Sequence, residues 1–122
     1  MSKTIITSLE NRTELLNLLK VNKGLIILKF GASWCKPCKL IEHEVHHFFM
    51  SLPDTVICGD IDIDESFDVY AYLKSKRMVV GIPAIVCYKK GNITYIPDDF
   101  VSGSDKSQLQ HFFSRCINLL HE

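Results

Sequence analysis

The chain has 122 residues, of which 47% are apolar and 23% are charged, as in ordinary globular proteins. A chain of this length can bury a core without disulfide cross-links or a structural metal, and we expect a single domain over residues 1–122. Basic and acidic residues number 14 each, so no net charge favours binding to nucleic acid or to a membrane. We expect neither kind of partner, and we expect the chain to act as a monomer.

The amino-terminal residues lack the apolar run and the small-residue cleavage site of a signal peptide. The longest apolar stretch, residues 24–30, is interrupted by Lys29 and is too short to cross a bilayer. These features predict a cytoplasmic protein, in a compartment where thiols are normally kept reduced.

The first half of the chain alternates apolar runs of strand length with stretches of helical spacing. The run at residues 25–30 is almost continuously apolar, which is typical of a strand buried on both faces. Asn11 followed by Glu14 indicates a capping box at a helix start. We expect an edge strand at residues 4–6, a helix between Asn11 and Gly24, further strands at 25–30 and 55–63, and further helices at 36–50 and 66–76.

The second half contains a strand at residues 84–88, a hairpin turn at 89–92 and a return strand at 93–96. Asp105 with Gln108 indicates the cap of the last helix. We expect this helix to point Leu109, Phe112, Phe113, Ile117 and Leu120 inward. Helical crossovers require parallel pairing and hairpins require antiparallel pairing, so we predict an α/β fold with a central mixed β-sheet flanked by helices on both faces.

Residues 34–38 read Trp-Cys-Lys-Pro-Cys and lie where the long apolar strand turns into a helix. Cys35 at the helix start faces unsatisfied backbone N–H groups and the positive end of the helix dipole, which favour a nucleophilic thiolate. Lys36 adds a nearby positive charge, and Pro37 suits an early helical position because it has no N–H to lose. Cys38 lies about one turn further along the same face, close enough to attack a mixed disulfide on Cys35.

Two other interpretations of the cysteine pair stay open. Such a pair can be half of a zinc site, but zinc needs four ligands and the sequence has no second Cys-x-x-Cys. The pair could also be inert, although the strand–turn–helix context is typical of redox motifs. Three histidines on the following helix are interpreted as surface residues, and no metal is expected: His43, His46 and His47.

The remaining cysteines are Cys58, Cys87 and Cys116, and we call them the bystander thiols. They are scattered along the chain and make the total odd, which argues against a framework of structural disulfides. Two lie in apolar strands and one lies on the last helix, so we expect all three to pack as small hydrophobic side chains.

The motif and two later segments together resemble the thioredoxin family. The matching segments are residues 25–39, the Asp-Ile-Asp-Glu of residues 62–65 and the Gly-Ile-Pro-Ala of residues 81–84. The resemblance extends from about Asn11 to Leu120, which is nearly the whole chain. It implies the thioredoxin fold and a thiol–disulfide oxidoreductase whose only redox group is its own disulfide, with no external cofactor.

By this resemblance, Cys35 is the attacking cysteine and Cys38 is the resolving one, while Trp34 forms an aromatic shoulder of the site. Pro83 would be a cis-proline that faces the two sulfurs, although most X–Pro bonds are trans.

The resemblance also implies where a substrate binds. A cis peptide before Pro83 would leave the backbone of Gly81 and Ile82 open to pair with an extended substrate strand. The loop that contains Ser102 and Gly103 would form the neighbouring wall.

Among the departures from the family pattern, two place a lysine at or beneath the active site. Lys36 stands between the cysteines where the family usually has glycine, and Lys29 stands where the family normally has an acidic residue that accepts and returns the resolving cysteine's proton. Lys29 is either an edge-facing lysine that extends to solvent or half of an exchanged ion pair. Asp60 falls about where the family's lysine often lies, so the second interpretation predicts a buried Lys29–Asp60 pair beneath the active site.

The expected activity is reduction of disulfides in client proteins, with a reductase that recharges the dithiol. Two alternatives stay open: a binding or chaperone-like module with an idle dithiol, and a disulfide oxidase or isomerase. Both cysteines and Pro83 are present, which favours the reductase.

Overall fold

Five strands and four helices follow one another over residues 3–122, the part of the chain that the computed structural model describes. Their order along the chain is the predicted one. The strands are β1 (Ile5–Ile6), β2 (Leu25–Gly31), β3 (Val56–Asp62), β4 (Ala84–Lys89) and β5 (Asp99–Ser102), and the helices are α1 (Arg12–Lys20), α2 (Lys36–Ser51), α3 (Phe67–Ser75) and α4 (Lys106–Leu120). Within these residues, no helix combines the length and the apolarity needed to cross a membrane.

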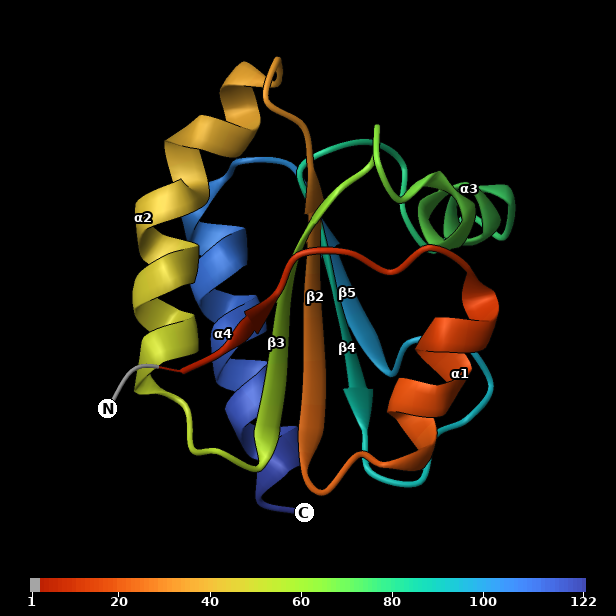
Figure 1. Ribbon diagram of the computed structural model, residues 1–122. Coiled ribbons are helices and arrows are strands. Elements are labelled where there is room, and N and C mark those ends of the chain that lie inside the picture. The colour runs from red at the N-terminus through yellow and green to blue at the C-terminus, as the bar shows by residue number, and fades with distance from the viewer. Residues whose placement is uncertain (1–2) are drawn as a thin grey trace.

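The five strands form one sheet in the order β1-β3-β2-β4-β5. The pairs β1–β3 and β2–β3 are parallel, whereas β2–β4 and β4–β5 are antiparallel. Figure 1 shows α2 and α4 against one face of the sheet and α1 and α3 against the other. The predicted α/β fold, with a mixed sheet and helices on both faces, is confirmed.

β2 is buried along its whole length, because it is the middle strand and helices cover both of its faces. Successive side chains of a strand alternate between the two faces. Leu28 and Phe30 belong to the core beneath α1 and α3, whereas Leu25 and Ile27 belong to the core beneath α2 and α4. Lys29 has the same parity as the second set, so its side chain lies on the face that α2 covers.

Side chains cap the helices at both ends of the chain. Asn11 accepts a hydrogen bond from the N–H of Glu14 at 3.0 Å, and Asp105 accepts one from the N–H of Gln108 at 2.9 Å. Both caps satisfy an N–H that would otherwise be unpaired at a helix start. The Glu14 carboxylate accepts in return from the N–H of Glu10 at 2.8 Å, one residue before the cap that a standard capping box uses.

The prediction of a return strand at residues 93–96 is wrong, because β5 begins only at Asp99. The preceding residues form a longer loop, in which the Asn92 amide donates a hydrogen bond to the carbonyl oxygen of Ile96 at 2.8 Å. Tyr95 takes a left-handed φ of 67°, which a strand does not allow. Local side-chain bonds of this loop therefore replace the expected ladder.

One side chain of α4 also differs from the prediction. Ile117 is 40% exposed, so the prediction that it points inward is wrong. The buried residues follow one helical stripe: Leu109, Phe112, Phe113 and Cys116. Ile117 lies one residue beyond this stripe, which turns it about 100° away from the sheet.

Candidate active site

The sequence motif at residues 34–38 lies at the junction of β2 and α2, at the upper end of the sheet in Figure 1. Cys35 is the N-cap of α2, and its Sγ accepts a hydrogen bond from the backbone N–H of Cys38 at 3.2 Å. The sulfur thereby takes the place of the side-chain oxygen that usually caps a helix. Pro37 lies in the first turn of α2, where its missing N–H leaves no hydrogen bond unmade.

Cys35 and Cys38 form a disulfide, with their Cα atoms 5.3 Å apart. The two residues are 4% and 5% exposed, respectively. The first turn of the helix sets their separation, because residues three positions apart lie on one face. Among residues 3–122, no three His, Cys, Asp or Glu side chains gather as a metal site requires. The pair is placed to cycle between disulfide and dithiol.

Trp34 precedes the disulfide and extends into solvent, with 64% of the residue exposed. Its indole Nε1 donates a hydrogen bond to the Asp64 carboxylate at 2.8 Å. Asp64 lies in the loop between β3 and α3, so this bond ties the ring to a second loop. The sequence gives Asp64 no role beyond its place in the segment at residues 62–65, because the contact depends on the folded chain. Lys36, on the other side of Cys35, is also exposed.

The Ile82–Pro83 peptide is cis, as the family resemblance implies. Pro83 immediately precedes β4, the antiparallel neighbour of β2, so it lies at the end of the sheet where β2 stops. Gly31, the last residue of β2, lies against the resolving sulfur: a β-carbon built there would be 3.3 Å from Cys38 Sγ. The proline and the cysteines therefore share one end of the sheet.

Two loops meet beside Pro83. Its carbonyl oxygen accepts a hydrogen bond from the N–H of Gly103 at 2.8 Å. Gly103 has a φ of 92°, a left-handed conformation that glycine adopts without steric strain. Ser102 is the last residue of β5, and the backbone groups of Gly81 and Ile82 form no hydrogen bond within the described part of the chain. The structure thus brings the two expected substrate-binding segments together.

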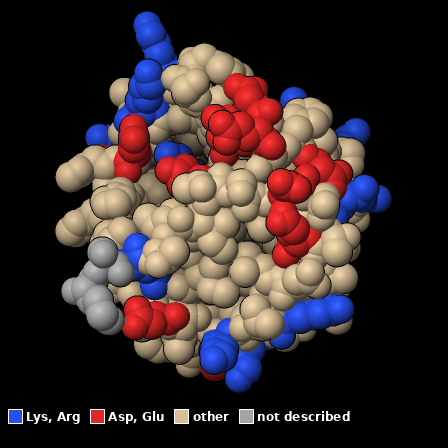
Figure 2. All heavy atoms as spheres, in the orientation of Figure 1, with Lys and Arg blue, Asp and Glu red and all other residues tan. Residues whose placement is uncertain are grey.

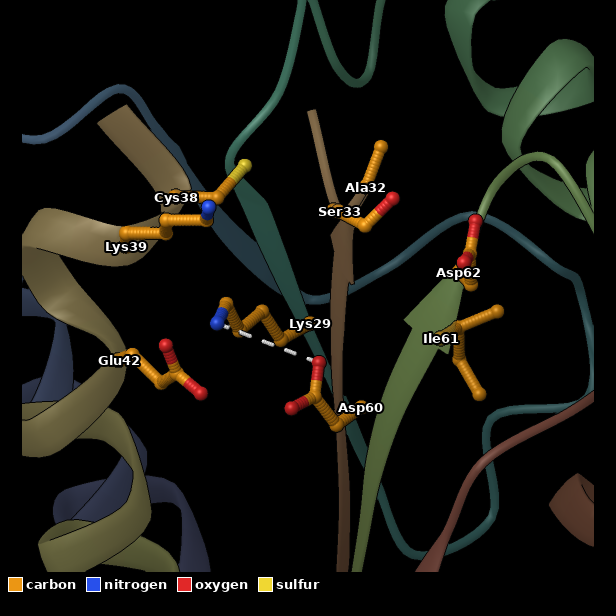
Figure 3. A pocket seen from close by; sticks show the side chains of 10 residues that line it. Lys29, Ala32, Ser33, Cys38, Lys39, Glu42, Asp60, Ile61 and Asp62 are labelled. Carbon is orange, nitrogen blue, oxygen red and sulfur yellow. Dashed lines mark ion pairs between the residues drawn. The ribbon is translucent and has the colours of Figure 1, made fainter. Parts of the chain in front are cut away.

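A cavity of about 390 Å³ lies beneath Cys38. Three elements line it, namely β2, β3 and the first half of α2. Its charged side chains, several of which are drawn in Figure 3, are Lys29, Lys39, Glu42, Asp60 and Asp62. Glu42 is the member that the sequence does not single out, although its spacing of four residues from Cys38 places both on one face of α2.

Lys29 has only 5% of its side chain exposed, so the interpretation as an edge-facing lysine is wrong. It lies on the middle strand, directly opposite Asp60 in the parallel register of β2 and β3. The Lys29 Nζ is 4.0 Å from Asp60 Oδ1, at the limit of an ion pair. The Asp60 side chain is 51% exposed, so the expectation that both partners are buried is wrong for this one. The reason is that β1 ends opposite the residue before Asp60 and leaves it uncovered.

The bystander thiols are all buried in the core beneath α2 and α4, as expected. Burial raises the pKa of Cys58 to about 12. A hydrogen bond with Cys116, together with burial, raises the pKa of Cys87. Cys58 and Cys87 therefore remain protonated at neutral pH and are poor nucleophiles, unlike a cysteine at a helix start.

Charges of opposite sign flank the site on the surface. Figure 2 shows acidic side chains gathered near the upper end of the molecule, over the ends of β2 and β3, and basic side chains at the edge nearer the start of α2. Lys36 and Lys39 are exposed residues of the first turn of α2.

Comparison with known proteins identifies the family. The family model described as Thioredoxin matches residues 6–115. Mitochondrial thioredoxin-3 of Saccharomyces cerevisiae is 37% identical over 94 residues, which cover 75% of this chain and 68% of that protein. A thioredoxin of Ophiophagus hannah is 33% identical over 110 residues, covering 90% of this chain and 93% of that protein.

Solved structures agree with the sequence comparison. The oxidised form of mitochondrial thioredoxin 3 from Saccharomyces cerevisiae superposes with a TM-score of 0.69 at 28% identity, covering 90% of this chain and 94% of that one. A thioredoxin of Fasciola hepatica superposes with a TM-score of 0.68, also at 28% identity, covering 90% of this chain and 98% of that one. The chain therefore belongs to the thioredoxin family, whose members are oxidoreductases that act on protein thiols and disulfides.

Proposed function

We propose that the chain reduces disulfides in client proteins through its Cys35–Cys38 dithiol. The Cys35 thiolate attacks one sulfur of the client disulfide, and the other client sulfur leaves as a thiolate that takes up a proton. Cys38 then loses its proton and attacks the sulfur of Cys35, which forms the Cys35–Cys38 disulfide and breaks the bond to the client. Two electrons pass from the dithiol to the client, which leaves with two thiols.

The hydrogen bond from the Cys38 N–H to Cys35 Sγ, at 3.2 Å, carries the assignment of the attacking cysteine. It places the sulfur of Cys35 at the amino-terminal end of α2, where the helix dipole and the free N–H groups favour a thiolate. The exposed fractions of 4% and 5% do not separate the two cysteines. The order of attack therefore rests on this electrostatic difference.

We further propose that an extended client segment lies along the residues before β4. The unpaired backbone groups of Gly81 and Ile82 support this, because they are free to form strand-type hydrogen bonds. The space beside Gly81 is open, since a β-carbon built there meets no atom within 4 Å. In this arrangement Trp34 borders the client on one side and the Ser102–Gly103 segment on the other.

The dithiol has to be regenerated after each cycle, so the proposed partners are a reductase and disulfide-containing clients. The proposed compartment is the cytoplasm. Support comes from the proposed reaction, which needs a compartment that keeps the Cys35–Cys38 pair available as a dithiol. One relative is a mitochondrial protein, and subcellular fractionation decides between the two compartments.

Trapping of mixed disulfides tests the proposed function. Cys38→Ser keeps the attacking thiol but removes the resolving one, so covalent complexes with clients should accumulate on non-reducing gels. Cys35→Ser should trap none. Cys116→Ala in the Cys38→Ser background is the matched control and should trap as much as Cys38→Ser alone. A reversed pattern would show that Cys38 attacks first, and trapping by neither variant would favour a binding module with an idle dithiol.

A further inference from the structure

The cavity beneath Cys38 is lined by further charged side chains besides the Lys29–Asp60 ion pair. Figure 3 shows the ammonium group of Lys29, from β2, lying between the carboxylates of Glu42, from α2, and Asp60, from β3. Glu42 forms no ion pair within 4.0 Å among residues 3–122, whereas Asp60 is paired with Lys29. Glu42 and Asp62 are therefore both without a cationic partner among the described residues, but Asp62 already accepts a hydrogen bond from the N–H of Asp64 at 2.8 Å.

Burial of the charged Lys29 side chain costs free energy, which points to a functional role for this charge. Its only ionic partner among the described residues lies 4.0 Å away, which is longer than a hydrogen bond. Removing an ammonium group from water is costly when the partner is distant and half-exposed. The apolar neighbours Val45 and Phe49, which line the adjoining cavity together with Lys29, would accommodate a methionine instead.

The resolving step needs a proton acceptor beside Cys38. As the Cys38 sulfur attacks Cys35, its proton has to leave, and a charged ammonium group cannot take it. Glu42 can take it, because it lies on the same helix and the same face as Cys38, one turn further on. Gly31 leaves the Cys38 sulfur open toward the cavity, since a β-carbon there would stand 3.3 Å from it.

On the basis of the proposed function, we propose that Lys29 and Glu42 divide the acid–base work that the family normally assigns to one acidic residue. The ammonium group of Lys29 stabilises the Cys38 thiolate, and the carboxylate of Glu42 accepts the Cys38 proton through water in the cavity. The Cys35–Cys38 bond forms, the bond from Cys35 to the client breaks, and the client thiolate is protonated from solvent. Glu42 then releases its proton to solvent.

Several other titratable groups face this cavity and are part of any pH profile. Lys39 from α2 and Asp60 and Asp62 from β3 line it, and His43 and His46 from α2 line the adjoining cavity. Asp60 is the less suitable acceptor because it is already paired with Lys29 and lies on the far side of that side chain from Glu42.

Quench-flow analysis of single turnovers tests the role of Glu42. Reduced protein is mixed with a disulfide client, and the reaction is stopped with acid at successive times. The free thiols are alkylated, and mass spectrometry then measures the amount of the mixed disulfide. In Glu42→Gln we expect an unchanged attack by Cys35 and a resolving step slower by about a hundredfold, the lower end for loss of a general base. Added imidazole or acetate should restore the rate, which a merely structural defect would not show.

The matched control is Glu44→Gln, two positions away on the same helix but paired with Lys106 at 3.0 Å on the side facing α4. Its resolving step should keep the parent rate. If Glu42→Gln resolves as fast as this control, Glu42 is not the proton acceptor. If the parent protein releases no reduced client at all, the proposed function itself fails, and the two failures are distinguishable.

The role of Lys29 has its own readout. In a Cys35→Ser background, Cys38 is the remaining cysteine of the active site, and the bystander thiols are buried. The ultraviolet absorbance of the thiolate then reports the ionisation of Cys38. Lys29→Met should shift this ionisation to higher pH and lower the reduction potential in the parent background, whereas Lys29→Arg should preserve both. The exposed lysine Lys74 gives the control Lys74→Met, which should change neither. An unshifted titration in Lys29→Met would overturn the role of Lys29.

Discussion

Asparagine in place of Asp60 measures how much the ion pair beneath Cys38 contributes to stability. At 4.0 Å, two unit charges attract by about 4 kcal/mol where the effective dielectric constant is near 20. Water screens much of this attraction, because 51% of the Asp60 side chain is exposed. We therefore expect Asp60→Asn to lower the free energy of unfolding by about 1 kcal/mol, the upper end for exposed pairs, rather than the larger loss of a fully buried pair.

Methionine in place of Lys29 should act in the opposite direction. The variant removes the buried charge and adds an apolar side chain of similar length next to Val45 and Phe49. Replacement of a buried ionic group by a well-packed apolar one is often stabilising, so we expect the free energy of unfolding to rise by about 1 kcal/mol. Stability and the rate of the resolving step would then change in opposite senses in Lys29→Met.

Urea unfolding of the oxidised proteins, followed by circular dichroism, gives both free energies, and equal m values check that the two-state comparison holds. The exposed pair of Lys89 and Glu122, at 3.5 Å with side chains 48% and 59% exposed, supplies the controls Lys89→Met and Glu122→Gln. Each should change the free energy by less than about 0.5 kcal/mol. A loss of about 3 kcal/mol in Asp60→Asn together with a destabilised Lys29→Met would refute this reasoning, because the pair would then behave as a buried salt bridge.

Two further predictions concern groups with shifted pKa values. In the reduced, folded protein at neutral pH, an alkylating reagent should modify Cys35 and Cys38, whereas the bystander thiols should react only after unfolding. Peptide mass spectrometry identifies the labelled cysteines. Fast labelling of Cys58 in the folded state would contradict its pKa of about 12. The hydrogen bond from Lys106 lowers the pKa of Glu44 below its ordinary 4.5, so this pair contributes stability above that pH and loses it as the pH falls through the lowered value. Glu44→Gln should therefore destabilise the protein at neutral pH but not in acid, and an equal effect at both pH values in urea unfolding would contradict the assignment.

The features that the sequence predicts well depend on neighbours along the chain. The apolar run of β2, the caps at Asn11 and Asp105 and the position of Cys35 at a helix start are all properties of a few consecutive residues. Each of them sets a strand, a helix boundary or a sulfur at a helix terminus without reference to distant segments. The predicted element order and the cysteine pair follow from such local signals.

The features that the sequence misses depend on contacts between distant segments or on competing local bonds. The bond from Trp34 to Asp64 joins two loops, and the uncovered carboxylate of Asp60 reflects the early end of β1. The delayed start of β5 reflects the loop bonds of Asn92, which compete with ladder pairing. The spacing of four residues between Cys38 and Glu42 is visible in the sequence. It points to a role for Glu42 only once the fold places Lys29 of β2 in the same cavity.

The exchange of charge beneath Cys38 also determines the sign of its redox effect. A cation near Cys38 lowers the free energy of the thiolate, which exists only in the reduced protein, and leaves the disulfide unchanged. A more stable reduced form makes the corresponding disulfide a stronger oxidant. An acidic residue in place of Lys29 would act in the opposite direction while still accepting the proton. Placing the cation on β2 and the free carboxylate of Glu42 on α2 separates these two effects, so that the oxidising strength of the disulfide and the speed of the resolving step can be set by different residues.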